Sequence, residues 1–67
     1  MSEQRTAQLR ALEGLRVSLA LADGSRIDDC QLVSAGRSGM RTVWIHSNGF
    51  DVFIQRADVL DVWEPAA

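Results

Sequence analysis

Cysteine, histidine and proline occur only once each in this sequence of 67 residues, and tyrosine does not occur at all. Because Cys30 is the only cysteine, no disulfide can form within the chain. One cysteine and one histidine, His46, cannot supply the four protein ligands of a structural zinc site. We therefore expect no metal and no other cofactor.

Long apolar segments are also missing. No apolar run approaches the roughly 20 residues that a helix needs to cross a bilayer. The first residues, MSEQRTAQLR, are polar and lack the apolar centre of a secretory signal. A lone cysteine fits a reducing compartment. These absences predict a cytoplasmic protein that does not bind membranes.

Positive and negative charges nearly balance, and the formal net charge is only −2. The whole chain therefore has no general attraction to phosphate, and contact with a nucleic acid would need a local basic patch. The length allows one domain over residues 1–67 with one small core. Because disulfides and zinc are excluded, we expect self-association to supply the extra stability that so short a chain needs.

Good helix-forming residues fill the segment EQRTAQLRALE, which predicts a helix over about residues 3–13. Gly14 is well placed to end it. The apolar stripe of Ala7, Leu9 and Leu12 is narrow, so the helix needs a surface to dock on.

The hydrophobic period changes to two after Leu15, which indicates β-strands. A first strand ends at an Asp23-Gly24 turn. The second, over residues 26–34, loses its alternation at Asp28-Asp29-Cys30. One extra residue at that point predicts a β-bulge, which would bend the strand.

The strongest local signal is Asn48-Gly49 between two strand-like segments, residues 41–47 and 50–55, which predicts a hairpin. Its register places Trp44 opposite Phe53 and His46 opposite Asp51 on the outer face. A fifth strand follows over residues 59–63. The predicted fold class is mainly β: a short helix, then a strongly bent five-stranded antiparallel small barrel over about residues 15–64.

Three arginines are the first candidates for a binding site. In the hairpin register Arg41 lies opposite Arg56, and Arg37 precedes them in a Gly-Ser loop. All three arginines would therefore lie together on one rim of the domain, at the end of the hairpin remote from its turn. The alternative is a solvated rim that the nearby Asp58 neutralises.

Three large aromatic residues, Trp44, Phe53 and Trp63, are the second candidates. The apolar residues of the hairpin occupy its inner face, which pushes Trp44 and Phe53 outward. They could lie under Leu9 and Leu12 of the helix, at a contact between copies, or in a ligand platform.

His46 and Asp51 could pass for an acid–base pair, but they are expected to be solvated neighbours beside a turn. No nucleophile or third orienting group lies at a workable spacing, so we expect no enzymatic activity.

In the order and spacing of its elements the chain resembles the Sm-like superfamily, in particular the Hfq-type RNA chaperones. The resemblance runs through VSLALADGSRI, QLVS, the hairpin around Asn48-Gly49, FIQRADVLDV and Pro65, which is nearly the whole chain. It implies rings in which the fourth strand of one copy pairs with the fifth of the next. It also implies single-stranded RNA binding at the loops after the second and fourth strands, which are residues 35–41 and 55–58 here.

The chain departs from the Hfq-type pattern at three places. Ile54-Gln55-Arg56 stands where the family has Tyr-Lys-His, the loop at residues 35–39 has no aromatic residue, and Asp28-Asp29 replaces the glycine of the second strand. A base-stacking ring is therefore missing from both loops.

The sequence is consistent with two functional hypotheses. The first is a self-associating Sm-like domain that binds nucleic acid through a basic rim of Arg37, Arg41, Gln55 and Arg56, with Trp44, Phe53 and Trp63 at contacts between copies. The second is a monomeric SH3-like or Tudor-like module that grips a peptide through its exposed aromatic residues.

Overall fold

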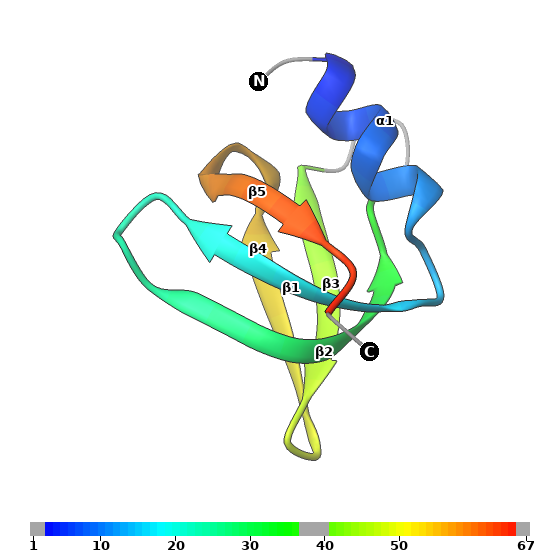
Figure 1. Cartoon of the computed structure of the whole chain (residues 1–67), viewed down its shortest axis with the longest axis vertical. Helices are drawn as coiled ribbons and strands as arrows, with labels where there is room; N and C mark the ends of the chain where they lie inside the picture. The colour runs from blue at the N-terminus through cyan, green and yellow to red at the C-terminus, as the bar shows by residue number, and fades with distance from the viewer. Residues whose placement is uncertain (1–2, 37–40, 66–67) are drawn as a thin grey trace.

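The computed structural model describes residues 3–36 and 41–65. The elements, in order, are helix α1 (Glu3–Ala11), strands β1 (Arg16–Leu21), β2 (Arg26–Ser34), β3 (Thr42–Ser47) and β4 (Phe50–Gln55), the 3₁₀ turn η1 (Arg56–Asp58), and strand β5 (Val59–Trp63). The strands form one antiparallel sheet in the order β4-β3-β2-β1-β5 (Figure 1). The predicted mainly-β class with a leading helix is confirmed. Strands β4 and β5 are the two edges of this sheet, so we describe it as strongly bent and not as a closed barrel.

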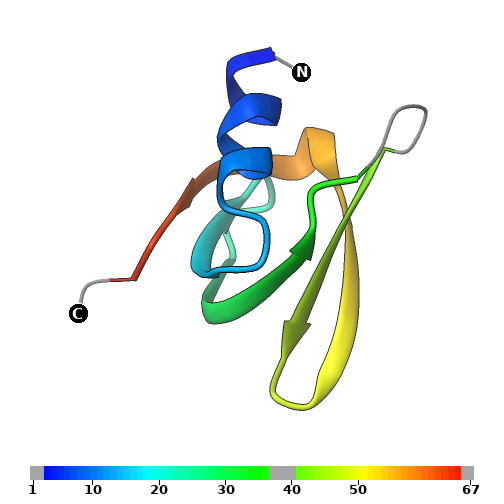
Figure 2. The same ribbon diagram turned by 90° about the vertical axis from the view of Figure 1, so that its right-hand side faces the viewer.

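The bend in β2 comes from the predicted bulge. Val17 of β1 pairs with Cys30, but Leu19 pairs with Ile27, so β2 has one more residue than β1 between these two pairs. Asp29 takes the left-handed conformation there, with φ of 52°. Beyond the bulge β2 continues along β3, where Leu32 pairs with Ile45. The strand curves through the molecule in both ribbon views (Figures 1 and 2).

The β3–β4 hairpin has the predicted register, with Trp44 opposite Phe53 and His46 opposite Asp51. Asn48 and Gly49 both have positive φ, 53° and 83°, as a tight two-residue turn between twisted strands requires. Helix α1 lies at one end of the molecule and this turn at the opposite end (Figures 1 and 2).

Helix α1 ends at Ala11, two residues before the predicted end. The backbone tightens there, because the amide of Leu12 donates to the carbonyl of Leu9 at 3.1 Å. Gly14 then adopts a φ of 84° and donates its amide to the carbonyl of Leu32 at 2.7 Å. The helix is thus tied to the end of β2.

Helix α1 docks on the sheet through a single apolar anchor, because Leu9 is fully buried while Ala7 is exposed. Polar contacts to β5 add to it: the side chain of Gln8 donates to the carbonyl of Val62 at 3.3 Å, and Arg5 pairs with Asp61 at 2.9 Å.

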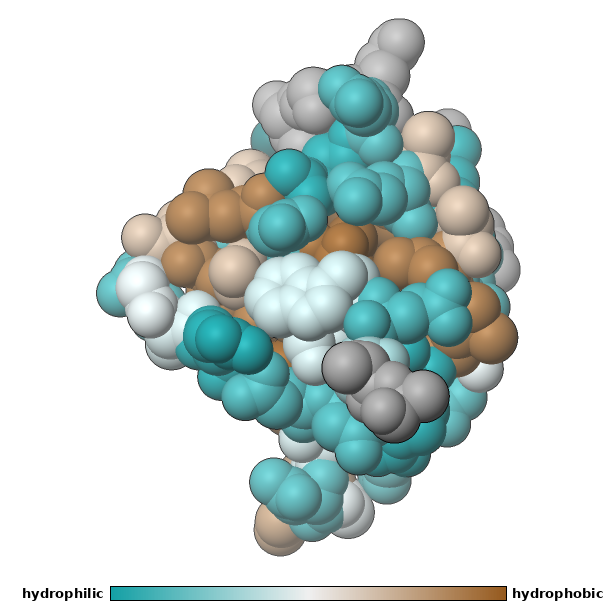
Figure 3. All heavy atoms as spheres, viewed as in Figure 1, coloured by the Kyte–Doolittle hydropathy of each residue, from teal (hydrophilic) through white to brown (hydrophobic). Residues whose placement is uncertain are grey.

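The core is one cluster that draws on the helix and on four of the strands; it comprises Leu9, Val17, Leu19, Cys30, Leu32, Ala35, Val43, Ile45, Val59 and Val62. Burial raises the pKa of the Cys30 thiol. On the outside, apolar side chains gather in separate groups between polar ones (Figure 3). No helix in the described part of the chain has the length and apolar character needed to span a bilayer.

Candidate nucleic-acid interface

Two arginines meet at the end of the hairpin that is remote from its turn. Arg41 directly precedes β3 and Arg56 directly follows β4. The amide of Arg56 donates to the carbonyl of Arg41 at 2.6 Å, so the backbone itself holds the two residues together. This is the juxtaposition that the hairpin register predicts.

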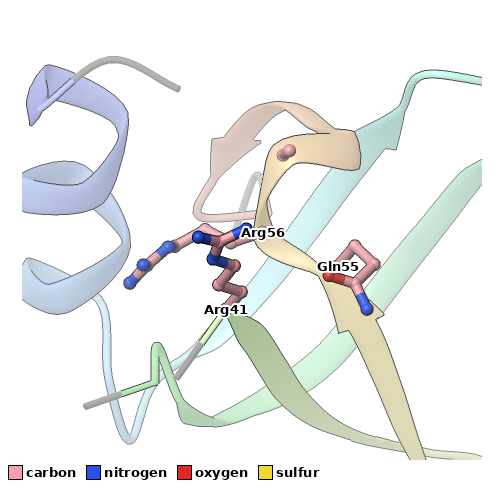
Figure 4. A pocket seen from close by; sticks show the side chains of 4 residues that line it. Arg41, Gln55 and Arg56 are labelled. Atoms are coloured by element: carbon pink, nitrogen blue, oxygen red, sulfur yellow. The ribbon is translucent and has the colours of Figure 1, made fainter. Parts of the chain in front are cut away.

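The two arginines line a pocket of about 270 Å³ together with Gln55 and Ala57, which we call the arginine pocket (Figure 4). Nη1 of Arg56 is buried and has no hydrogen-bond partner among residues 3–36 and 41–65. A guanidinium nitrogen that is removed from water without a partner is costly. An anion in the pocket would remove this cost, since guanidinium groups match the geometry of phosphate and carboxylate oxygens.

Asp58 does not neutralise these arginines, contrary to one of the two sequence-based expectations. Within the described residues no ion pair joins its carboxylate to Arg41 or Arg56. The turn η1 carries Asp58 toward β1, where its carbonyl accepts a hydrogen bond from the amide of Ala22 at 2.8 Å. Its side chain lines a different hollow, beside Leu21. Within the described residues, neither Arg41 nor Arg56 forms an ion pair with a carboxylate.

The other two predicted rim residues have different outcomes. Gln55 lines the pocket, yet its side chain points away from both arginines (Figure 4). Alternation along β4 places it on the same face of the sheet as Phe53. Arg37 lies outside the described residues.

Trp44 and Phe53 form a stacked pair on the outer face of the hairpin, with ring centroids 5.7 Å apart and an angle of 27° between the rings. Phe53 is 63% exposed and Trp44 36% exposed. Helix α1 does not cover them, because Leu9 is part of the core and Leu12 packs against it. Of the three sequence-based alternatives, burial under the helix is thus wrong.

Asp51 fixes the tryptophan of this pair. Its Oδ1 accepts a hydrogen bond from the indole Nε1 of Trp44 at 3.1 Å and lies 3.0 Å from Nδ1 of His46. The facing of His46 and Asp51 was predicted, but the contact with Trp44 was not. The register does contain the signal, because Asp51 is the diagonal neighbour of Trp44 across the hairpin, within reach of a long side chain.

These contacts predict an acid-sensitive contribution to stability. The hydrogen bond with His46, and then that with Trp44, lowers the pKa of Asp51. Since its pKa in the unfolded chain is about 3.9, the contribution is present above that pH and is lost as the pH falls through the lower, folded value. We expect the free energy of unfolding, measured in urea from about pH 5 to pH 2, to fall more steeply in the native chain than in Asp51→Asn. If the free energies of unfolding of the native chain and of Asp51→Asn fell in parallel with pH, the Asp51 carboxylate would contribute nothing to this pH dependence.

Trp63, the third aromatic candidate, is half-buried on β5 and has an intramolecular partner. The guanidinium carbon of Arg26 lies 5.4 Å from the centre of its ring, a cation–π contact. Arg26 also pairs with Asp28 at 2.9 Å. Trp63 is therefore separate from the Trp44–Phe53 pair.

In the described ranges, no group of three or more histidine, cysteine, aspartate or glutamate side chains is arranged to hold a metal ion. Comparison with family models, with curated proteins and with solved structures found no match for this chain. The case for a function therefore rests on the geometry of the arginine pocket and of the hairpin.

Proposed function

We propose that this chain is a non-catalytic binding domain that holds single-stranded RNA by a phosphate group in the arginine pocket. The observation that carries the proposal is the buried Nη1 of Arg56, which has no partner within the described residues and lies in a pocket that Arg41 also lines. Two guanidinium groups on adjacent backbone segments present several N–H donors to one anion.

A nucleic acid is the anion that we favour, because guanidinium groups match the geometry of a phosphate. The net charge of −2 gives the protein no general affinity for polyanions, so binding has to concentrate at the pocket. The resemblance to Sm-like proteins supports the same location, since residues 55–58 correspond to one of that family's RNA-binding loops.

We further propose that copies of the chain associate through the sheet edges. Strands β4 and β5 are both edges, and Leu60 of β5 is 55% exposed. Unpaired edges are ready to pair with another chain, and the small core gains stability from such pairing. Pairing of β4 with β5 of the next copy would repeat the arginine pocket around an assembly. The free, buried Cys30 accords with a location in the reducing cytoplasm.

The salt dependence of binding tests the proposal. The affinity for a fluorescein-labelled single-stranded RNA is measured by anisotropy at about 50 and 200 mM salt. One phosphate held by one chain predicts a loss of about two- to threefold in affinity over this range. Absence of binding, or an affinity that salt leaves unchanged, would exclude an arginine-held phosphate.

A further inference from the structure

The two arginines of the arginine pocket point to the same side of the hairpin. Arg41 lies two residues before the buried Val43. Arg56 lies two residues after Ile54, which pairs with Val43 and packs against the core. Alternation therefore directs both arginines to the inner side of the hairpin. In Figure 4 their side chains extend to one side and that of Gln55 extends to the other, so the two guanidinium groups can act together on one ligand.

Most of the other positive charge in the described part of the chain is already paired. Every basic residue is an arginine, because the sequence contains no lysine. Three arginines each pair with an aspartate: Arg5 with Asp61 at 2.9 Å, Arg16 with Asp29 at 2.7 Å, and Arg26 with Asp28 at 2.9 Å. Arg10 is exposed on helix α1. Among residues 3–36 and 41–65, two arginines without a carboxylate partner therefore occur together only in the arginine pocket.

This isolated charge suits one phosphate group better than a row of phosphates. Proteins that hold a single strand along its length combine aromatic stacking with a basic groove that tracks the backbone. The described residues provide no second pair of unpaired arginines for a neighbouring phosphate. The pocket of about 270 Å³ is also smaller than the roughly 300–1,000 Å³ of pockets that enclose drug-sized ligands. It therefore has room for one phosphate and its sugar, and the rest of the strand lies outside.

A phosphate monoester matches the two positive charges of this pocket, whereas a phosphodiester does not. Each phosphodiester within a strand carries a single negative charge and has two free oxygens. A monoester carries about −1.5 to −2 at pH 7 and has three acceptor oxygens. One guanidinium group binds two of these oxygens as a fork, and the third remains for the other arginine. The extra oxygen is the acceptor that the buried, unpartnered Nη1 of Arg56 requires.

We propose that the arginine pocket binds a phosphate monoester at the end of the RNA strand in preference to the phosphodiesters within the strand. The strand enters end-on: the terminal phosphate lies between Arg41 and Arg56, and the attached nucleotide leads out of the pocket. A terminal phosphate has the strand on one side only, so its free oxygens can enter to the depth of Nη1. This inference rests on the proposed function and specifies which phosphate of the strand the pocket selects.

The test compares unlabelled RNA strands of about eight nucleotides as competitors of one terminally phosphorylated strand that carries a label on a central base. The competitors share one sequence and differ only in their ends. One has hydroxyls at both ends, one has a phosphate at the 5′ end, one has a phosphate at the 3′ end, and one has the terminal phosphate as its methyl ester. The methyl ester is the matched control, because it keeps the phosphate but removes one charge and one free oxygen.

We expect a phosphate at one of the two ends to strengthen binding at least about tenfold over hydroxyls at both ends. The methyl ester should bind within about threefold of the strand with two hydroxyl ends. Replacing Arg41 and Arg56 together by alanine should abolish the difference between the strands, and Arg10→Ala should retain it. Far-UV circular dichroism checks that each variant is folded.

Equal affinities of all the strands, with binding still lost in the double arginine variant, would overturn this inference and leave the proposed function standing. If no strand bound the native chain, the proposed function would fail together with the inference. A preference for the phosphorylated strand that survives in the double variant would place the terminal phosphate outside the pocket, which also overturns the inference. A mononucleotide that competes as strongly as the phosphorylated strand would identify a small phosphate monoester as the ligand and overturn RNA as its source.

Discussion

Replacing Arg41 and Arg56 together by alanine is expected to weaken the binding of single-stranded RNA by about 100-fold at low salt. Each arginine would donate charged hydrogen bonds to a phosphate, and a loss of about 1.4 kcal/mol at each position gives this factor. The salt slope should also fall, because the phosphate held in the pocket is no longer neutralised. Fluorescence anisotropy with a labelled oligonucleotide measures both quantities.

Arg10→Ala is the matched control for this double variant. Arg10 is an exposed arginine of helix α1, so its removal changes the net charge without touching the arginine pocket. Arg10→Ala should change the affinity for RNA by no more than about twofold, as expected for a distant surface charge. Equal losses in Arg10→Ala and in each single pocket variant would show that RNA responds to total charge and not to the pocket.

Leu9→Ala is expected to have the largest effect on stability. Leu9 is fully buried and is the apolar anchor by which helix α1 joins the core. Leucine-to-alanine changes at such positions cost about 2–5 kcal/mol. A domain of this size has a total stability of roughly 3–10 kcal/mol, so the variant should be largely unfolded or close to it at 37 °C. Urea unfolding, followed by tryptophan fluorescence, measures the change.

Leu15→Ala provides the comparison for Leu9→Ala, because it is the same substitution a few residues along the chain at a side chain that is 45% exposed. Its cost should be about 0.5 kcal/mol or less. If the two variants lost equal stability, or if Leu9→Ala lost less than about 1 kcal/mol, the helix would not be anchored to the core through Leu9.

The parts of the fold that sequence predicts well are those fixed by local chemistry. Asn48-Gly49 is suited to the two left-handed residues of a tight turn, and once the turn is fixed every pair in the hairpin follows. The bulge at Asp29 was readable because the apolar positions on either side lose their alternation. The end of helix α1 was less well predicted, because a long-range hydrogen bond from Gly14 to Leu32 determines it.

The arginine pocket was predicted only in part, for a physical reason. The adjacency of Arg41 and Arg56 follows from the hairpin register, which extends one pair beyond the strands. The direction of Gln55 follows from alternation along β4, but that of Asp58 depends on the turn η1, whose course no local pattern indicates. Because η1 carries Asp58 toward Ala22, its carboxylate forms no ion pair with Arg41 or Arg56.

For the aromatic residues, too, the sequence predicts the local placement but not how the rest of the chain packs around them. Alternation on β3 and β4 was enough to place Trp44 and Phe53 on the outer face of the sheet. Whether the helix covers them depends on how α1 packs, and Leu9 enters the core instead. The stacked pair is thus exposed on the outer face of the hairpin, the face that also carries Gln55.

The most direct test of the central claim is the side-chain NMR spectrum of the arginines in ¹⁵N-labelled protein as single-stranded RNA is added. We predict that the Nε–Hε signals of Arg56 and Arg41 shift strongly on binding, while those of Arg10 and of Arg16, which already pairs with Asp29 at 2.7 Å, stay in place. Bound RNA that leaves the Arg56 signal unmoved would contradict the claim that its guanidinium group holds a phosphate.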